Sequence, residues 1–335
     1  MSTKNKREKP KYGMWRCVGF QFSRAFRYRA EVPFILLLQI LFNISSGVFG
    51  FYMSPMILAK LEARSPVNEL LLTAAFLIGG CLVSDAMIAF IGNGIGSWGV
   101  KATYQVELRS HILRELMNKM ADTSYANCLD TNWQRLMERG KQCCNSNGAA
   151  CEYIWHVLQE LMVRLAMFGF FAAVLTHVHP LVFGVAMTLS ILDFIVSSYV
   201  YKYNFRHREE LSHLDKQMWY LTGRTRDLTL AKDIRLFGLE SWIRRLTDKA
   251  FLARQAYSKR EHIFYLIGTF SSTLLEFLRS GATCYILLKM CLESGMSAAE
   301  FMLYFSAVNS FNGQFSGVLN NLLELRKMCL NLSSL

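Results

Sequence analysis

The sequence predicts an all-α membrane protein with six transmembrane helices and long cytoplasmic helical extensions. Three observations support this fold class: the length of six apolar stretches, their uneven spacing, and the distribution of Lys and Arg. A bilayer hydrocarbon core about 30 Å thick needs ~20 apolar residues at 1.5 Å rise each, so every stretch is long enough to span it. The stretches are 33–53, 70–91, 157–178, 181–200, 263–288 and 301–323.

The links between these stretches alternate between short and long. Short links join the first stretch to the second, the third to the fourth and the fifth to the sixth, whereas long polar segments at about 92–152 and 201–261 follow the second and the fourth. Because successive spans cross the bilayer in opposite directions, both long segments emerge on one side. The predicted organisation is a basic tail with an interfacial helix over 1–32 and a six-helix membrane domain over 33–335.

Lys and Arg are concentrated at the N-terminus and after the fourth stretch. Residues 1–32 contain nine Lys and Arg but only Glu8 and Glu31 as acids, while the short link 59–69 is balanced and the link 178–180 has no formal charge. Cytoplasmic segments of membrane proteins carry an excess of Lys and Arg. We therefore expect a multi-pass protein of the plasma membrane with both termini and both long segments in the cytoplasm.

The overall composition excludes an ordinary soluble domain. Of 335 residues, 52% are hydrophobic and 19% charged, which leaves little polar surface for a chain of this length. The net charge of +12 would suggest nucleic acid in a soluble protein, but beside spanning stretches it is explained by topology and anionic lipid headgroups. The expected partners thus include the lipid bilayer and no nucleic acid.

The nine cysteines lie mostly in segments predicted to be cytoplasmic or membrane-spanning, which argues against a disulfide framework. Their one cluster consists of Cys143, Cys144 and Cys151, which lack CxxC spacing and have no histidine closer than His156. We expect free thiols packed between helices and no metal site.

The N-terminal segment has a helical pattern of its own. Trp15, Val18, Phe22 and Phe26 recur at helical spacing, and arginines occupy other faces. This pattern predicts an amphipathic helix in the headgroup region, ending where the chain turns into the membrane at Pro33. Such a helix can also bind a partner protein, but its place directly before a spanning stretch favours the membrane surface.

The two long polar segments are predicted to be helical. In the first, a helix over 101–120 is followed by a polar break at 122–132 and then by renewed helix. In the second, a turn near Gly223 precedes a short helix at about 230–240 and a further helix from Trp242. The pattern indicates two out-and-back helical hairpins, each with a short transverse piece at its tip.

Two motifs at these tips resemble the intracellular loops of ATP-binding-cassette (ABC) exporters. The stretch Lys232-Asp-Ile-Arg-Leu-Phe-Gly-Leu-Glu-Ser-Trp242 resembles the second loop, which usually reads charged residue, Ile or Val, Lys or Arg, apolar residue, Phe-Gly, and then an acidic position. The stretch Thr123-Ser-Tyr-Ala-Asn-Cys-Leu-Asp130, followed by Trp133, is similar to the first loop, with Ser124 and Leu129 where acids are usual. With the six-stretch layout, the resemblance covers nearly the whole chain and implies the type-1 transmembrane fold of ABC exporters.

The resemblance implies that each tip carries a coupling helix that docks into a nucleotide-binding domain. Independently, Leu230, Ile234 and Phe237 fall at i, i+4 and i+7, which would give a short helix one apolar ridge. The alternative is a structural helix buried in a cytoplasmic bundle. The implied residues are Tyr125, Asn127 and Asp130 in the first coupling helix and Lys232, Ile234, Arg235, Phe237 and Gly238 in the second.

The chain has no ATP-binding motif of its own. It contains neither a G-x-x-x-x-G-K-[ST] string nor the family's serine-glycine-glycine signature, and the glycines at 92, 94, 96 and 99 are better explained by close helix packing. We therefore expect no catalytic residue, no nucleotide-binding domain and no cofactor in this chain. The resemblance implies that ATP and Mg²⁺ bind a partner nucleotide-binding domain, supplied by a separate chain or by a missing C-terminal part.

The expected function is that of the permease domain of a bacterial, exporter-type ABC transporter. It would pair with a second membrane half as a homo- or heterodimer and move a substrate, which the sequence does not indicate, by alternating access. One alternative is a truncated or regulatory membrane subunit that dimerises with a complete transporter and does not transport. Another is an unrelated integral-membrane enzyme, for which His156, His207 and His213 lack metal spacing.

Six polar residues within the apolar stretches fall at a common level. Counted at 1.5 Å per residue from the predicted outer helix ends, they lie roughly 15–22 Å deep. A charge in hydrocarbon costs at least ~2.5 kcal/mol, so these side chains are expected to face a partner or a wet cavity. Alternatively, residues such as Glu276 and Arg279, three positions apart, satisfy each other locally. The six are Asp85, Asp193, Glu276, Arg279, Asn309 and Asn312.

Overall fold

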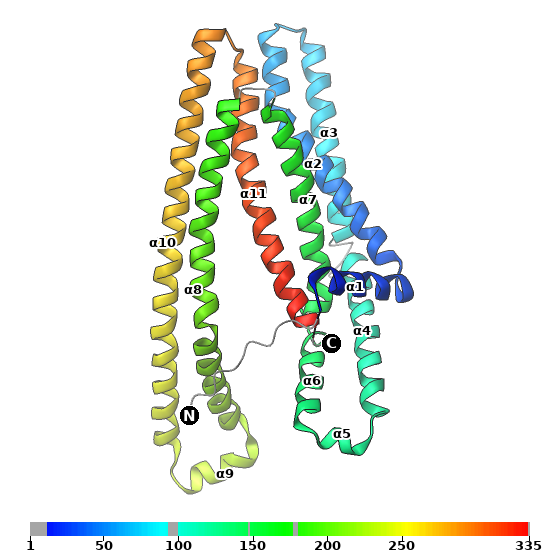
Figure 1. Cartoon of the computed structure of the whole chain (residues 1–335), viewed down its shortest axis with the longest axis vertical. Coiled ribbons are helices and arrows are strands. Elements are labelled where there is room, and N and C mark those ends of the chain that lie inside the picture. The colour runs from blue at the N-terminus through cyan, green and yellow to red at the C-terminus, as the bar shows by residue number, and fades with distance from the viewer. Residues whose placement is uncertain (1–11, 93–99, 147, 177–179, 334–335) are drawn as a thin grey trace. The chain divides into compact units, whose positions relative to one another are not determined.

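The computed structural model describes residues 12–92, 100–146, 148–176 and 180–333 (Figure 1). Within these ranges the chain is almost entirely α-helical and contains no strand. The predicted all-α fold class is therefore confirmed. Of the four glycines assigned to close helix packing, those at 94, 96 and 99 lie outside the described residues.

The chain divides into two compact units, which we describe separately. Unit 1 comprises Met1–Gly184 and Thr283–Leu335, and unit 2 comprises Val185–Ala282. Unit 2 contains α9 (Leu228–Leu236) and the longer parts of α8 (Pro180–Arg226) and α10 (Glu240–Ser294). Unit 1 contains α1 (Met14–Tyr28), α2 (Glu31–Glu62), α3 (Val67–Gly92), α4 (Val100–Ala121), α5 (Tyr125–Leu129), α6 (Thr131–Gln142), α7 (Ala150–Thr176) and α11 (Ala298–Leu332).

The core of unit 1 lies where α1, α4 and α7 meet the C-terminal part of α11. Trp155 of α7 is completely buried there, and the ring of Phe22 on α1 packs edge-on against it at a centroid distance of 5.0 Å. Leu108 and Ile112 of α4 and Leu325 of α11 fill the surrounding volume. Burial of one large apolar side chain stabilises a fold by ~1.5–3 kcal/mol, so this core holds the four helices together.

Three helices, α2, α3 and α7, are long and apolar enough to cross a membrane. In the most apolar window of α2 and of α3 only 17% of the residues are buried, so most of these apolar side chains face outward. Outward-facing apolar helices of this length are expected in lipid rather than in water. The structure thus supports a multi-pass membrane protein by length and composition.

The other three predicted spans are helical as well. The stretch 181–200 lies in α8, where Met187–Val196 is a shorter apolar segment, 263–288 lies in α10, and 301–323 lies in α11. Charged and amide side chains such as Glu276 and Asn312 interrupt the apolar character of α10 and α11. Six spans and their orientation therefore remain a prediction.

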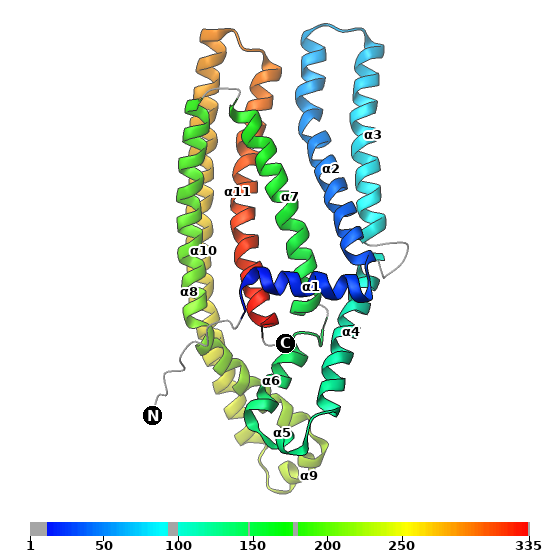
Figure 2. The same cartoon turned by 45° about the vertical axis from the view of Figure 1, so that its right-hand side comes forward.

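Both hairpins are present, each within its own unit. In unit 1, α4 and α6 are joined by the short α5 across their ends, as the polar break at 122–132 predicted (Figure 2). In unit 2, α9 joins the ends of α8 and α10 (Figure 1). The predicted turn near Gly223 is wrong, because α8 continues through Gly223 to Arg226 and the break falls at Asp227. A glycine inside a helix costs only about 1 kcal/mol, which a long helix tolerates.

The N-terminal helix is confirmed as α1, and it has two different faces. Trp15 and Phe26 are exposed, as expected for a lipid-facing stripe, whereas Val18 is buried in the core of unit 1. Two ion pairs fix α1 to α4: Arg24 to Glu115 at 2.9 Å and Arg29 to Glu107 at 2.7 Å. Between them the ring of Tyr28 stacks on His111 of α4 at 5.0 Å, and the Tyr28 hydroxyl also donates a hydrogen bond to Glu115. Because it forms this hydrogen bond, the pKa of Tyr28 lies above the usual value for tyrosine.

Candidate functional site: the two hairpin tips

The tip of unit 1 is held by hydrogen bonds from neighbouring segments. Ser124 precedes α5 without capping it through its side chain. The amide of Gln134 on α6 donates to the carbonyl of Cys128 at 2.7 Å, and the amide of Asn127 donates to the hydroxyl of Thr123 at 3.2 Å. Asp130 caps α6, since its carboxylate accepts the backbone N–H of Asn132 at 3.0 Å.

All three residues predicted for the first coupling helix, Tyr125, Asn127 and Asp130, are exposed, and Tyr125 is the apolar one among them. Its side chain is 78% exposed, and Leu129, four positions on, is exposed as well. The polar groups of Asn127 and Asp130 are engaged within the hairpin itself. At this tip, Tyr125 and Leu129 provide exposed apolar surface for contact. The amide of Asn127 and the carboxylate of Asp130 stabilise the local backbone conformation.

In the tip of unit 2, α9 has a capping residue at its N-terminal end and a glycine that terminates it at its C-terminal end. Asp227 caps α9 by accepting the backbone N–H of Thr229 at 3.0 Å and the Thr229 hydroxyl at 2.6 Å. At the other end Gly238 has φ +61°, the left-handed region that favours glycine, and the backbone N–H of Leu239 donates to the carbonyl of Ile234 at 2.9 Å. These two devices fix where α9 begins and ends.

The exposed apolar surface of this tip lies at the C-terminal end of α9. Leu236 is 71% exposed and Phe237 is 68% exposed, whereas Leu230 and Ile234 are half-buried within the hairpin. The predicted ridge therefore faces outward only at Phe237, and Leu236 is the apolar neighbour that the i, i+4, i+7 pattern missed. Two consecutive apolar residues directly before a glycine were the available signal. Lys232 and Arg235 are exposed beside them.

The six polar residues predicted to share one level fall in both units. In unit 1, Asp85 is exposed and accepts the hydroxyl of Ser46 at 2.7 Å, Asn312 is buried and Asn309 is half-buried. In unit 2, Arg279 is 1% exposed, and its guanidinium lies 3.8 Å from the carboxylate of the exposed Glu276. Asp193 is also buried and interacts electrostatically with Arg279. Each unit thus holds part of the set, and a common cavity remains a prediction.

One charged pair in α7 was not recognised in the sequence. Glu160 and Arg164 form an i, i+4 ion pair at 3.2 Å within this candidate span. A Cβ on Gly317 of α11 would come within 2.5 Å of the Arg164 side chain, so the glycine makes room for the guanidinium stem. The Glu-x-x-x-Arg spacing was the signal for this ion pair in the sequence. That the pair lies opposite a glycine is seen only from the packing of α7 on α11.

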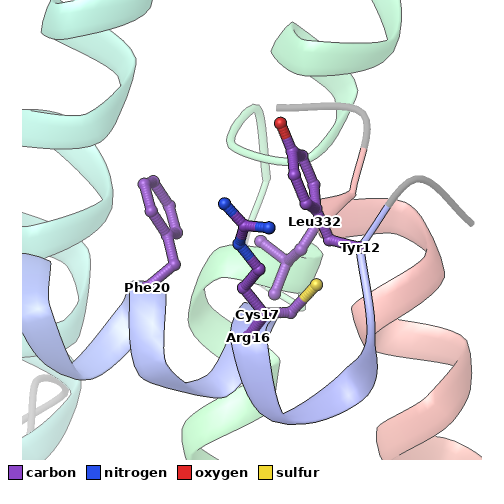
Figure 3. A pocket seen from close by; sticks show the side chains of 5 residues that line it. All are labelled: Tyr12, Arg16, Cys17, Phe20 and Leu332. Carbon is purple, nitrogen blue, oxygen red and sulfur yellow. The ribbon is translucent and has the colours of Figure 1, made fainter.

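A cavity of about 300 Å³ lies between α1 and the end of α11 (Figure 3). Its walls are Tyr12, Arg16, Cys17, Phe20 and Leu332. The guanidinium of Arg16 lies 4.7 Å from the centre of the Tyr12 ring, a cation–π distance. The guanidinium of Arg16 is thus engaged with the ring at the cavity wall, and Leu332 of α11 forms the wall from the other helix.

Within the described ranges, no group of three or more His, Cys, Asp and Glu is arranged to hold a metal ion. His156 and His213 are exposed and His207 is half-buried. The carbonyl of His207 accepts the hydroxyl of Tyr257 at 3.2 Å, a contact that joins α8 to α10 within unit 2.

No protein-family model matches this chain, and no curated protein is significantly similar to it. The resemblance to ABC exporters therefore rests on the loop motifs and the six-stretch layout read from the sequence. The geometry of the two tips is the part of the structure on which a functional argument can be built.

Proposed function

We propose that this chain is the membrane domain of an exporter-type ABC transporter. It moves its substrate by alternating access, driven by nucleotide-binding domains that bind ATP and Mg²⁺ outside this chain. The observation that carries the proposal is the tip of α9, where Leu236 and Phe237 are exposed next to Lys232 and Arg235 and are held between a cap and a left-handed glycine.

An exposed apolar pair at a helix end has the properties of a docking element. Burying two large apolar side chains against a partner stabilises a complex by ~1.5–3 kcal/mol each. Because Asp227 and Gly238 fix α9 before binding, little ordering cost opposes this gain. The flanking cations favour a partner groove with acidic residues at its rim.

The length of the helices supports the proposal independently. α8 has 47 residues and α10 has 55, which at 1.5 Å per residue gives about 70 and 80 Å. A bilayer core of ~30 Å accounts for less than half of either helix. Long continuous helices that leave the membrane can carry a displacement at their tips back to the membrane segment, as alternating access requires.

In the proposed transporter the chain is one of two membrane halves in the plasma membrane, with both termini cytoplasmic. The second half is another copy of this chain or a related one. Each of the two tips, α5 and α9, contacts a nucleotide-binding domain. ATP binding closes those domains, and the helices of the hairpins convey the movement to the spans.

The test begins with the DNA adjoining the coding sequence, which is read for a cassette ATPase, in frame or as a neighbouring gene. That ATPase is purified with this chain in lipid nanodiscs. We expect the complex to hydrolyse ATP and the isolated chain neither to bind nor to hydrolyse it. Binding of micromolar ATP by the isolated chain would refute the proposal. Assembly with an already complete transporter, without substrate movement, would instead support a regulatory subunit.

A further inference from the structure

Five of the nine cysteines lie together in the core of unit 1: Cys17, Cys143, Cys144, Cys151 and Cys329. The Sγ atoms of Cys144 and Cys151 are 3.2 Å apart, and both residues are almost completely buried. We propose that Cys144 and Cys151 form a dithiol–disulfide site that a hydroperoxide oxidises to an intramolecular disulfide.

The backbone itself brings these two residues together. The N–H of Cys151, in the first turn of α7, donates to the carbonyl of Cys143 at 3.1 Å, and Cys143 is the residue that ends α6. The N–H of Cys144 in turn donates to the carbonyl of Lys141 at 2.9 Å. A disulfide needs an S–S distance of about 2.05 Å, so the sulfurs must approach by about 1.1 Å, which small χ rotations can supply.

The two thiols are not equivalent. The Cys144 and Cys151 thiols share a hydrogen bond in which either sulfur can donate, and Cys144 also lies in the field of Arg109; these influences lower the pKa of Cys144 although burial opposes them. Arg109 is held in place by Glu152 at 2.8 Å. Since the thiolate is the reactive form and Arg109 acts on Cys144, we assign Cys144 as the attacking sulfur and Cys151 as the resolving one.

The neighbouring thiol pair in the same core lacks this activation. Burial, together with the adjacent Cys17, raises the pKa of Cys329 to about 12. Burial also raises the pKa of Cys17. Both of these thiols stay protonated at neutral pH, and they serve as internal reference thiols for the reaction at Cys144.

The oxidation balances with hydrogen peroxide as the only other reactant. The Cys144 thiolate attacks one peroxide oxygen, the O–O bond breaks, and the departing hydroxide takes up a proton to leave as water. The Cys151 sulfur then attacks the sulfenic sulfur of Cys144, an S–S bond forms, and the S–O bond breaks. The hydroxide released carries away the Cys151 proton as a second water, so two thiols and one peroxide give one disulfide and two waters.

Gln21 of α1 provides a polar neighbour for the reaction. Its side chain is fully buried within hydrogen-bonding reach of the Cys151 thiol, and its amide nitrogen and oxygen form no other hydrogen bond within the described chain. A buried amide with so few hydrogen bonds is costly, so such a group calls for an explanation. A sulfenic acid formed between Cys144 and Cys151 would be a polar species in an apolar core, and the Gln21 amide is placed to bond to it.

The experiment uses the full chain in lipid nanodiscs, treated with hydrogen peroxide or with a reducing thiol, then denatured and alkylated. Peroxide is chosen because buried thiols are reached by a molecule near the size of water through local openings. Trypsin releases residues 142–164 as one peptide that contains Cys143, Cys144 and Cys151. We expect this peptide to accept three alkyl groups after reduction but only one, on Cys143, after peroxide, with Cys17 and Cys329 still fully alkylated.

Serine variants show which two cysteines form the disulfide. Cys143→Ser should still lose two hydrogen atoms on oxidation, whereas Cys144→Ser and Cys151→Ser should not. Wild-type mapping decides the matter even if a variant fails to fold. Three free thiols in this wild-type peptide after peroxide, or a bond that includes Cys143, would overturn the proposal. Oxidation of Cys17 or Cys329 ahead of Cys144 would overturn it as well.

Discussion

The tip of unit 1 and the tip of unit 2 both reverse the chain through a short helix, yet they stabilise that helix differently. At the first tip the capping carboxylate, Asp130, belongs to the returning helix α6, and α5 is held by Gln134 from outside. At the second tip the capping carboxylate, Asp227, belongs to α9 itself, and Gly238 closes its other end. α9 is thus self-contained, whereas α5 depends on its hairpin.

This difference bears on how each tip can contact a partner. A self-contained helix presents its exposed side chains in one geometry before binding, and pre-organised contacts give most of the affinity at an interface. A helix held from outside adapts to the partner and yields less net binding energy. We therefore expect the α9 tip to dominate assembly with a nucleotide-binding domain and the α5 tip to contribute less.

The largest expected effect follows from Phe237→Asp, which removes the exposed ring and places a charge at the proposed contact. We expect binding of the partner ATPase to weaken about 30-fold or more, as for the loss of a hot-spot aromatic worth ~2 kcal/mol. Affinity is measured between the chain in nanodiscs and the purified ATPase. The matched control is Phe251→Asp, an exposed phenylalanine on α10 in the same unit. Equal losses in both variants, or none at Phe237, would remove α9 from the interface.

The second variant, Tyr125→Ala, tests the first tip. We expect a weaker loss of affinity, about 5- to 10-fold, because one exposed ring on an externally held helix contributes ~1 kcal/mol. The control is Met117→Ala, an exposed apolar residue on α4 in the same hairpin. A loss at Tyr125 that exceeds the loss at Phe237 would reverse the proposed order of the two tips.

In the second hairpin the sequence located the C-terminal end of α9 better than its start, for a physical reason. Phe237-Gly238 marks a helix end because glycine alone enters the left-handed region without strain, and the structure finds φ +61° there. Gly223 is also a glycine, but its position does not require a left-handed conformation, and α8 continues through it. A glycine in a sequence does not reveal its φ, so the turn predicted near Gly223 was wrong.

Other features depended on packing that no pattern along the chain records. Trp15, Val18, Phe22 and Phe26 share a helical face by spacing, but the core of unit 1 reaches Val18 and leaves Trp15 outside. Likewise the cysteine cluster was visible in the sequence, while the Sγ–Sγ contact of 3.2 Å depends on the turn between α6 and α7. Helical periodicity indicates which face of a helix is apolar, and tertiary contacts decide how much of that face is buried.

A pair of glycine substitutions sharpens the comparison between helix ends and helix interiors. A Cβ at either Gly223 or Gly238 would meet nothing within 4 Å, so packing does not enter. Gly238→Ala forces an L-residue into the left-handed region and should destabilise the α9 tip by about 1–2 kcal/mol. Gly223→Ala should stabilise α8 by about 1 kcal/mol. Hydrogen exchange of the amides in each helix measures both effects, and effects of the same sign would contradict this reasoning.

The smallest effects are expected from the two caps, and they test most directly which helix each tip secures. Asp130→Ala and Asp227→Ala each remove a carboxylate that accepts a backbone N–H at 3.0 Å. Each should cost about 1 kcal/mol, which raises local hydrogen exchange roughly 5-fold. Asp227 also accepts the Thr229 hydroxyl at 2.6 Å, so its loss should be the larger by a few tenths of a kcal/mol. The decisive readout is location: faster exchange is expected in α6 after Asp130→Ala and in α9 after Asp227→Ala. If Asp130→Ala instead speeds hydrogen exchange in α5 as much as Asp227→Ala speeds it in α9, the two tips are stabilised in the same way. In that case the predicted order of their contributions to binding loses its basis.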